Sequence, residues 1–433
     1  MKKELRKQKL AEIRSQETPY MTGIRIRYRG EKRLFNAYKI PLEYLIYNKY
    51  NGRIGSLVKS YEKQRHIINA EDAEGTKLIE RFLWESKPAR NETTKNSLVR
   101  DGQKQWGIVT DDGIIIDGNR RAMLLNEIYR NREHWERKNH NVDEAQYFIA
   151  VILPEGAEPR EVSRLETIYQ MGEDEKLDYN PIEKYLKCQD LRDIHGFGPS
   201  DIADMMGEKE GQITEWLEIM VLMEDYLEYL GYEGIYTRLD KREGQFVNLN
   251  QYLKRYENGS KMVDWPCAET DIADLKSVCF DYIRARYEGK EFRYIARPSK
   301  VESIFCKGEV WRDFLTAHSD KVEPVTEAEV TVEELRAENP DADLTKLLEA
   351  RDNDWTTGTK DALEGNLQRA KRAVELIKEA DQPTKLVIRA IDTLRKINTE
   401  AATFYTQEVH DLLKELNSLT WEYRQMIKRE RKK

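Results

Sequence analysis

The sequence predicts an α+β fold in which a small sheet domain precedes a long helical region. Patterns typical of strands, either alternating or continuous apolar runs, end near Pro154. From about residue 158 onward, apolar residues recur at helical spacing instead. The chain has 433 residues, which is too many for one hydrophobic core, so two or three domains are expected.

The composition indicates a cytoplasmic protein without a membrane span. Charged residues make up 35% of the chain, and no stretch approaches the roughly 20 apolar residues that cross a bilayer. The charged N-terminus lacks the apolar run of a secretory signal. Four cysteines lie far apart without a Cys-x-x-Cys pair, so we expect reduced structural thiols rather than a zinc site. The net charge of −7 excludes uniform coating of nucleic acid but permits local binding.

The first part of the chain mixes helices and strands. Residues 2–16 are expected to form a short basic helix, and residues 23–29 alternate apolar and basic side chains, as a half-buried strand does. A second strand over residues 38–46 runs into a helical turn, and residues 57–98 are largely helical. We predict that residues 1–34 form a basic N-terminal extension, whose lysines and arginines are either solvated or in contact with DNA.

The remaining strands surround two tight turns. The expected order is strand 106–110, turn 111–113, strand 114–116, turn 117–119, helix 120–130 and strand 147–153. The last of these strands closes a sheet domain that we assign to residues 35–155.

The turn at Asp117-Gly118-Asn119 has the features of a phosphate-binding site. It ends a strand and opens a helix, so free backbone N–H groups and the positive end of the helix dipole face it. Gly118 permits positive φ and the close approach of a phosphate. Arg120 and Arg121 follow directly, and guanidinium groups bind phosphate oxygens bidentately. The alternative is an ordinary strand-to-helix turn with two surface arginines.

Successive segments of the chain resemble the boxes of the N-terminal domain of ParB proteins, which has a ParB/sulfiredoxin-like fold. The matching segments are residues 39–48, 97–102, 107–122 and 180–183, followed by a helix-turn-helix. In that family the segment matching Gly118 to Arg121 contacts the triphosphate of CTP or ATP. The resemblance therefore implies a nucleotide-binding domain, with Asp117 and Asn119 in the same turn. Arg53 takes the place of a family arginine and faces either the nucleotide or the next domain, or is a structural loop residue.

Two departures from the family limit what the resemblance implies. Sulfiredoxins carry a catalytic cysteine where this chain has Asn119, so peroxiredoxin repair is not expected. The Glu-Asn-Leu-Gln-Arg box of ParB clamps reads Glu166-Thr-Ile-Tyr-Gln170 here, followed by an insertion. We predict that Glu166 is the catalytic carboxylate and the Mg²⁺ ligand, because a hard cation prefers carboxylate oxygen. Glu173 is the alternative, and a solvated helix position remains open for both.

A helix-turn-helix is expected within a helical domain at residues 156–235. Its helices are expected at residues 182–194, 199–207 and 212–222. The third helix would enter the major groove, with Gln212 and Thr214 at the base edges. No lysine or arginine lies on this helix, so a structural or protein-docking tri-helix remains the alternative to DNA binding.

The rest of the chain is expected to be helical. Residues 236–325 form a mixed, mostly helical region, and residues 326–433 form a helical C-terminal interaction module. Apolar stripes over residues 363–377, 386–397 and 409–427 predict a hairpin or bundle. These stripes must be buried against one another or against another chain.

The sequence thus predicts an ATP- or CTP-binding, Mg²⁺-dependent nucleoside triphosphatase that acts on DNA. The resemblance implies a place in bacterial DNA modification or phage defence. The expected partners are DNA, a protein of a DNA-modification complex and a second copy bound through the C-terminal helices. Two alternatives remain at this point. One is a CTP-gated clamp that serves partition or transcription, and the other is a ParB-like nuclease whose metal is held by Asp111, Asp112 and Asp117.

Overall fold

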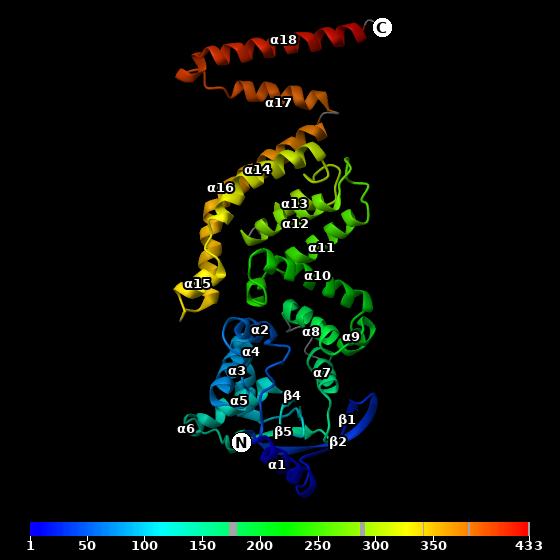
Figure 1. Ribbon diagram of the computed structural model, residues 1–433, viewed down its shortest axis with the longest axis vertical. Coiled ribbons are helices and arrows are strands. Elements are labelled where there is room, and N and C mark those ends of the chain that lie inside the picture. The colour runs from blue at the N-terminus through cyan, green and yellow to red at the C-terminus, as the bar shows by residue number, and fades with distance from the viewer. Residues whose placement is uncertain (173–179, 286–290, 341, 380–381, 432–433) are drawn as a thin grey trace.

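The computed structural model describes residues 1–172, 180–285, 291–340, 342–379 and 382–431. The molecule is elongated, with the sheet domain at one end and the last two helices at the other (Figure 1). A helical body lies between them. Every described strand precedes residue 153, so the prediction of an α+β chain with a sheet before a helical region is confirmed.

The sheet has five strands in the order β1-β2-β5-β3-β4. Their bounds are Met21–Tyr28 for β1, Glu31–Pro41 for β2, Gly107–Val109 for β3, Ile115–Asp117 for β4 and Tyr147–Ile152 for β5. The pairing of β3 with β5 is parallel, and the other three pairings are antiparallel. The strands expected from alternation and apolar runs are therefore present.

The N-terminal segment is an integral part of the sheet domain. β1 pairs with β2 from Met21↔Ala37 to Tyr28↔Glu31. The first helix, α1 (Lys3–Gln16), buries Leu10 and Ile13 in the core beneath the sheet. A boundary at residue 34 would cut β2, so the prediction of a basic extension over residues 1–34 is wrong.

The basic side chains of α1 bind the turn between β3 and β4. Arg6 is buried and donates a hydrogen bond to the backbone carbonyl of Asp112. Lys3 forms an ion pair with Asp112 at 3.0 Å, and Lys7 forms one with Asp111 at 3.1 Å. These cations, which we expected to be solvated or bound to DNA, hold the protein's own N-terminus in place.

Helices cover the sheet, and one of them, α5, begins at the predicted phosphate-binding turn. Their bounds are Gly55–Gln64 for α2, Ala73–Ser86 for α3, Pro88–Asp101 for α4, Asn119–Arg130 for α5 and Arg132–Glu136 for α6, with short 3-10 turns at Leu42–Tyr44 and Asp143–Gln146. On α5 the apolar residues Ala122, Leu125 and Ile128, which recur at helical spacing, are all buried. The helical periodicity of this segment therefore predicted its packing face correctly.

A compact helical unit follows the sheet. It comprises α7 (Pro159–Thr167), a π-helical turn η3 (Ile168–Gly172), α8 (Pro181–Asp193), α9 (Pro199–Met206) and α10 (Glu210–Tyr229). Helix α9 ends at Gly207, whose φ of 60° is the left-handed cap expected of a glycine. The three helices of the expected helix-turn-helix are thus α8, α9 and α10.

The helical body surrounds one large core. It contains the turn η5 (Tyr236–Leu239), α11 (Glu243–Glu257), α12 (Glu269–Arg284), α13 (Glu291–Ala296), α14 (Gly308–Glu327), α15 (Val332–Glu338) and α16 (Leu344–Glu379). Its centre holds a buried charge cluster in which Asp352 accepts hydrogen bonds from Tyr232, Arg238 and Arg284. The basic partners compensate the cost of removing this carboxylate from water.

Helix α16 belongs to this body and not to a separate module. It lies along α14 (Figure 1) and buries Leu348, Trp355 and Leu363 in the shared core. A boundary at residue 325 would cut α14 near its end. The predicted interaction module at residues 326–433 therefore begins too early, because the apolar stripe on α16 is already covered.

The last two helices have no buried residues. They are α17 (Pro383–Arg395) and α18 (Gln407–Glu430), joined through a 3-10 turn at Ala402–Tyr405. On α18 the apolar residues Val409, Leu412, Leu416, Leu419, Tyr423 and Met426 follow alternating spacings of three and four. This spacing is the heptad repeat of a helix that packs against another helix. The sequence left open whether these apolar stripes are buried within the chain or against another chain. In α17 and α18 they are not buried within the chain.

No helix in the described ranges combines the length and apolarity needed to cross a membrane.

We predict that deleting residues 380–433 changes the free energy of unfolding by no more than about 0.5 kcal/mol, since neither terminal helix buries a side chain. Deleting residues 325–433 also removes Leu348 and Trp355 from the core and is expected to unfold the helical body. Urea denaturation followed by circular dichroism compares the two truncations. A large loss of stability in the shorter deletion would mean that α17 and α18 do pack on the body.

Candidate phosphate-binding site

A cavity of about 210 Å³ lies at the turn between β4 and α5. Its walls come from the loop before α2, from α4, from the approach to β3, from the β4–α5 turn and from η3. The lining residues are Asn51, Arg53, Arg90, Thr94, Gln105, Asp117, Gly118, Asn119, Arg120, Arg121 and Gln170. Four of them are arginines and one is acidic, so the cavity is strongly basic.

Gly118 sets the geometry of the turn. Its φ is 103° and its ψ is 16°, which is left-handed backbone at the N-terminus of α5. A Cβ at this position would lie 2.5 Å from Cζ of Phe148, which is too close for any other residue. The turn therefore requires glycine for both backbone and space, and it directs the first N–H groups of α5 toward the cavity.

Three predicted ligands of the turn also hold its structure. Asn119 is buried, accepts a hydrogen bond from the Asn48 N–H at 2.8 Å and donates one to the Ile115 carbonyl at 3.0 Å. Arg121 pairs with Asp117 at 2.7 Å, and the same guanidinium donates to the carbonyls of Gln105 and Trp106. The side chains of Asp117, Asn119 and Arg121 thus fix the turn, although all three line the cavity.

Three further arginines reach the cavity from separate elements. Arg53 lies in the loop before α2, Arg90 in the first turn of α4 and Arg120 in the first turn of α5. The loop that carries Arg53 is stabilised by its own backbone contacts, since the Asn51 side chain accepts from the Arg53 N–H at 3.0 Å. Three positively charged side chains therefore lie around a small space next to a helix N-terminus. Guanidinium groups and helix N-termini both attract phosphate groups.

Glu166 lies behind this site and does not line the cavity. It is buried, with 2% of its surface exposed. One carboxylate oxygen accepts from the Gly52 N–H at 3.0 Å, and the other pairs with the ammonium group of Lys187 at 2.8 Å. A metal ion would have to displace the lysine. The geometry thus opposes the predicted roles of Glu166 as Mg²⁺ ligand and catalytic carboxylate, and makes it a positioning residue for the Arg53 loop.

No other carboxylate replaces it among the described residues. Glu173, the alternative considered from the sequence, lies outside them. Within the described ranges, no three residues of the types His, Cys, Asp or Glu gather closely enough to hold a metal ion. Asp111, Asp112 and Asp117 each pair with a basic side chain, namely Lys7, Lys3 and Arg121. In the nuclease alternative, each of these three aspartates would have to exchange its basic partner for the metal ion.

Five lining residues were not anticipated from the sequence: Asn51, Arg90, Thr94, Gln105 and Gln170. Arg90 and Thr94 are four residues apart on α4, so they share one helix face. Gln170 is the last residue of the altered family box and sits in the π-helical turn, where it donates to the Ile116 carbonyl at 2.9 Å. The spacing of Arg90 and Thr94 indicates that they share a helix face, but the sequence does not show that this face lies against the β4–α5 turn.

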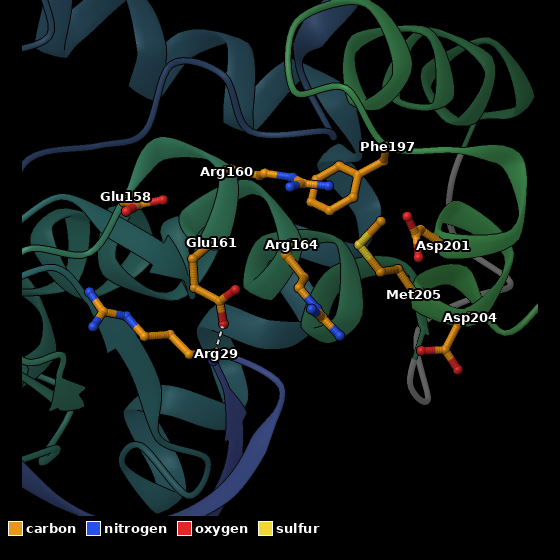
Figure 2. A pocket seen from close by; sticks show the side chains of 9 residues that line it. All are labelled: Arg29, Glu158, Arg160, Glu161, Arg164, Phe197, Asp201, Asp204 and Met205. Atoms are coloured by element: carbon orange, nitrogen blue, oxygen red, sulfur yellow. Dashed lines mark hydrogen bonds between the residues drawn. The ribbon is translucent and has the colours of Figure 1, made fainter.

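A second hollow, of about 450 Å³, lies between the β1–β2 turn, α7 and α9 (Figure 2). Here Arg29, Arg160 and Arg164 share the lining with Glu158, Glu161, Asp201 and Asp204. The Arg160 guanidinium lies 4.4 Å from the centroid of the Phe197 ring, as the stacked pair in Figure 2 shows. Because four acidic side chains accompany the three arginines here, the described lining of this hollow is less basic than that of the cavity at α5.

No protein-family model matches the chain, and no curated protein shows significant similarity to it.

Replacing Glu166 by Gln is expected to destabilise the fold by about 3 kcal/mol, because Lys187 is left buried without its counter-charge. Glu158→Gln, an exposed position at the start of the same helix, is the control and should leave stability unchanged. Adding Lys187→Met to Glu166→Gln should recover much of the loss. Thermal and urea unfolding measure these differences. Loss of nucleotide hydrolysis in a Glu166→Gln protein of normal stability would instead restore the catalytic role.

Proposed function

We propose that this protein binds the triphosphate of ATP or CTP in the cavity at α5 and uses nucleotide binding to control an action on DNA. The observation that carries the proposal is the convergence of Arg53, Arg90 and Arg120, from three separate elements, on the N-terminus of α5. Each guanidinium can bind phosphate oxygens bidentately, and the helix dipole favours the same negative charge. Three guanidinium groups that reach the cavity from separate elements match the spread-out negative charge of a triphosphate chain better than the charge of a single small anion.

Nucleotide binding is better supported than hydrolysis. Among the described residues that line the cavity, the acidic one is Asp117, and it is paired with Arg121. Mg²⁺ would enter with the nucleotide, since it is commonly held by substrate phosphates and water together with one or two carboxylates. We therefore propose a nucleotide-controlled protein whose turnover, where it occurs, is slow and secondary to binding.

The resemblance to ParB proteins supports a narrower proposal for this activity. The order of β3, turn, β4 and α5, followed by α7 to α10, agrees with a ParB/sulfiredoxin-like domain and its helix-turn-helix. On this basis we propose a component of bacterial DNA modification or phage defence, working with a partner protein of such a complex. The second candidate is a CTP-gated clamp, which needs two copies. The exposed heptad stripe on α18 favours that pairing, because such a stripe is normally covered by another helix.

The helix-turn-helix offers little to DNA. Residues 199–229 contain nine acidic residues and one basic residue. Gln212 donates to the Glu215 carboxylate and Thr214 to the Glu210 carbonyl, so both side chains expected at base edges already have partners. The phosphates of DNA would be repelled by this surface, because phosphate contacts depend on lysine and arginine. A protein-docking role, the alternative open from the sequence, suits α9 and α10 better.

The β1–β2 hairpin is a better surface for DNA. Arg25 and Arg27 alternate along β1, Arg29 follows in the turn, and Lys32 lies opposite Arg27 on β2. Arg27 also pairs with Asp204 at 3.1 Å, and Arg29 donates to the Gly156 carbonyl, so binding to DNA would exchange these contacts for phosphates. All four basic residues are exposed at the edge of the sheet. Alternate residues of a strand share one face at a spacing of about 6.8 Å, so the hairpin presents a row of cations. A two-stranded ribbon also fits the major groove. We propose that this hairpin contacts the DNA backbone.

Replacing Arg90 and Arg120 together by Ala should weaken the binding of ATP or CTP at least tenfold, since each lost charged hydrogen bond contributes about 1.5–3 kcal/mol. Arg100→Ala, an exposed position on the same helix as Arg90, is the matched control. Isothermal titration calorimetry with both nucleotides gives the affinities, and circular dichroism verifies folding. Undiminished affinity in the folded double variant would end the proposal.

Charge reversal at Arg25 and Lys32 is expected to weaken binding to duplex DNA and to lower the salt dependence of the affinity by about one phosphate contact for each residue. The comparison variant is Gln212→Ala with Thr214→Ala, which should bind as the unaltered protein does. Fluorescence anisotropy across a salt series provides both quantities. The reverse result, with the helix-turn-helix variant impaired and the hairpin variant intact, would move the DNA contact to α10.

A further inference from the structure

A larger cavity of about 450 Å³ adjoins the phosphate cavity. Arg53 and Arg120 line both, so the two spaces meet at these guanidinium groups. The other lining residues are Ser56, Leu57, Glu85, Ser86, Lys87, Asn180, Ile182, Glu183, Tyr236, Thr237, Asp240 and Thr345. They belong to two parts of the molecule that are far apart in the sequence.

One wall of this cavity comes from the helical body. Tyr236, Thr237 and Asp240 lie at η5, and Thr345 lies in the first turn of α16. The opposite wall includes Ser56 and Leu57 of α2 in the sheet domain. The two walls are linked at one edge, because the Thr237 N–H donates to the Ser60 hydroxyl at 3.1 Å. A molecule in this space would therefore contact both domains at once.

Size separates the roles of the two cavities. Sites for small molecules and cofactors commonly enclose about 300–1,000 Å³. The phosphate cavity, at about 210 Å³, falls below this range, whereas the adjoining cavity lies within it. A further hollow of about 820 Å³ continues past Leu57 and Thr345 but shares no lining residue with the phosphate cavity. A group attached to bound phosphates would thus enter the 450 Å³ space first.

The lining suits a base and a sugar. Leu57, Ile182 and the ring of Tyr236 offer apolar contact, while hydroxyl and carboxylate groups offer partners for sugar hydroxyls. Thr237 supplies a specific signal. Its hydroxyl oxygen is buried and has no hydrogen-bond partner in the part of the chain that the structure describes. A buried hydroxyl without a partner is costly, and a ligand that shifts the lining enough to expose this oxygen would satisfy it.

We propose that the base and ribose of the bound nucleotide lie in this interdomain cavity, held between α2 of the sheet domain and Thr237 and Thr345 of the helical body. The inference rests on the proposed triphosphate site and adds the part of the ligand that distinguishes a nucleotide from a phosphate chain. The helical body thereby becomes one wall of the nucleotide site, and nucleotide binding joins the two domains.

The test fills the cavity without touching the arginines. Thr345→Trp places a large side chain at the wall formed by α16, and Thr357→Trp, at an exposed position on the same helix, is the matched control. Calorimetry measures binding of inorganic tripolyphosphate, ATP and CTP to each protein. We expect tripolyphosphate to bind all three proteins equally. At least one of the two nucleotides should bind Thr345→Trp ten or more times more weakly than it binds the control.

The possible outcomes separate this inference from the function on which it rests. Equal nucleotide affinity in Thr345→Trp and the control would overturn the inference and leave the triphosphate site intact. Equal weakening of tripolyphosphate and nucleotide by Thr345→Trp would also overturn it, because the substitution would then act on the phosphate cavity. Failure of the unaltered protein to bind any of the three probes would overturn both proposals.

A smaller change covers the case in which Thr345→Trp does not fold. Thr237→Val removes the buried hydroxyl and keeps the shape of the side chain. It should weaken nucleotide binding about two- to tenfold, the value of one hydrogen bond, and leave tripolyphosphate binding unchanged. Unchanged nucleotide affinity in this variant would count against the inference.

Discussion

The geometry of the candidate site depends on the buried ion pair between Glu166 and Lys187. This ion pair connects α7 to α8 at 2.8 Å, and the other oxygen of the same carboxylate holds the Gly52 N–H of the Arg53 loop. Lys187 also lies 3.3 Å from the Ser163 hydroxyl, so both charges have partners where water is excluded. A buried ion pair is tolerated when its remaining donors and acceptors are satisfied, and it then fixes the geometry of the groups that satisfy it.

A second buried carboxylate fixes the other end of this loop. Glu183 accepts hydrogen bonds from the Ser56 N–H and hydroxyl at the start of α2. Burial raises the pKa of Glu183 to about 7. The Arg53 loop is thus held at Gly52 by one glutamate and at Ser56 by another, and both glutamates come from the helices that follow the sheet. The orientation of the arginine depends on the docking of α7 and α8 against the sheet domain.

The sequence was informative where local chemistry decides the structure. The β4–α5 turn follows from Gly118 and from the apolar run before it, and those features need no distant partner. The predictions that failed depend on contacts between residues that are far apart in the sequence. The alternating basic segment over residues 23–29 reads as a strand, but only its pairing with β2 shows that it is an edge of the main sheet. Arg90 lies in a helix whose sequence does not reveal which turn it meets.

The sequence could not show which apolar stripes of the C-terminal helices are buried, because burial also depends on contacts with distant segments. Leu363 on α16 and Leu412 on α18 occupy comparable positions in helical patterns, yet Leu363 is 1% exposed and Leu412 is 58% exposed. The difference is α14, which lies along α16 (Figure 1), whereas no described helix packs on α18 closely enough to bury a residue of it. Glu166 shows the same limit for chemistry. The sequence suggested a reacting group at this glutamate, but it could not show that Lys187 and Gly52 occupy both carboxylate oxygens.

Helix α16 gives the molecule mechanical reach. It runs without a proline for 36 residues, from Leu344 beside the interdomain cavity to Glu379 just before α17. A helix of that length spans about 54 Å, so a tilt of about 5° at the cavity would move its far end by about 5 Å. Because α16 is packed in the core of the helical body, such a tilt would involve the whole body and not the helix alone. The first turn of α16 lines the interdomain cavity and its last turn lies just before α17, so one helix connects the cavity to the exposed terminal helices.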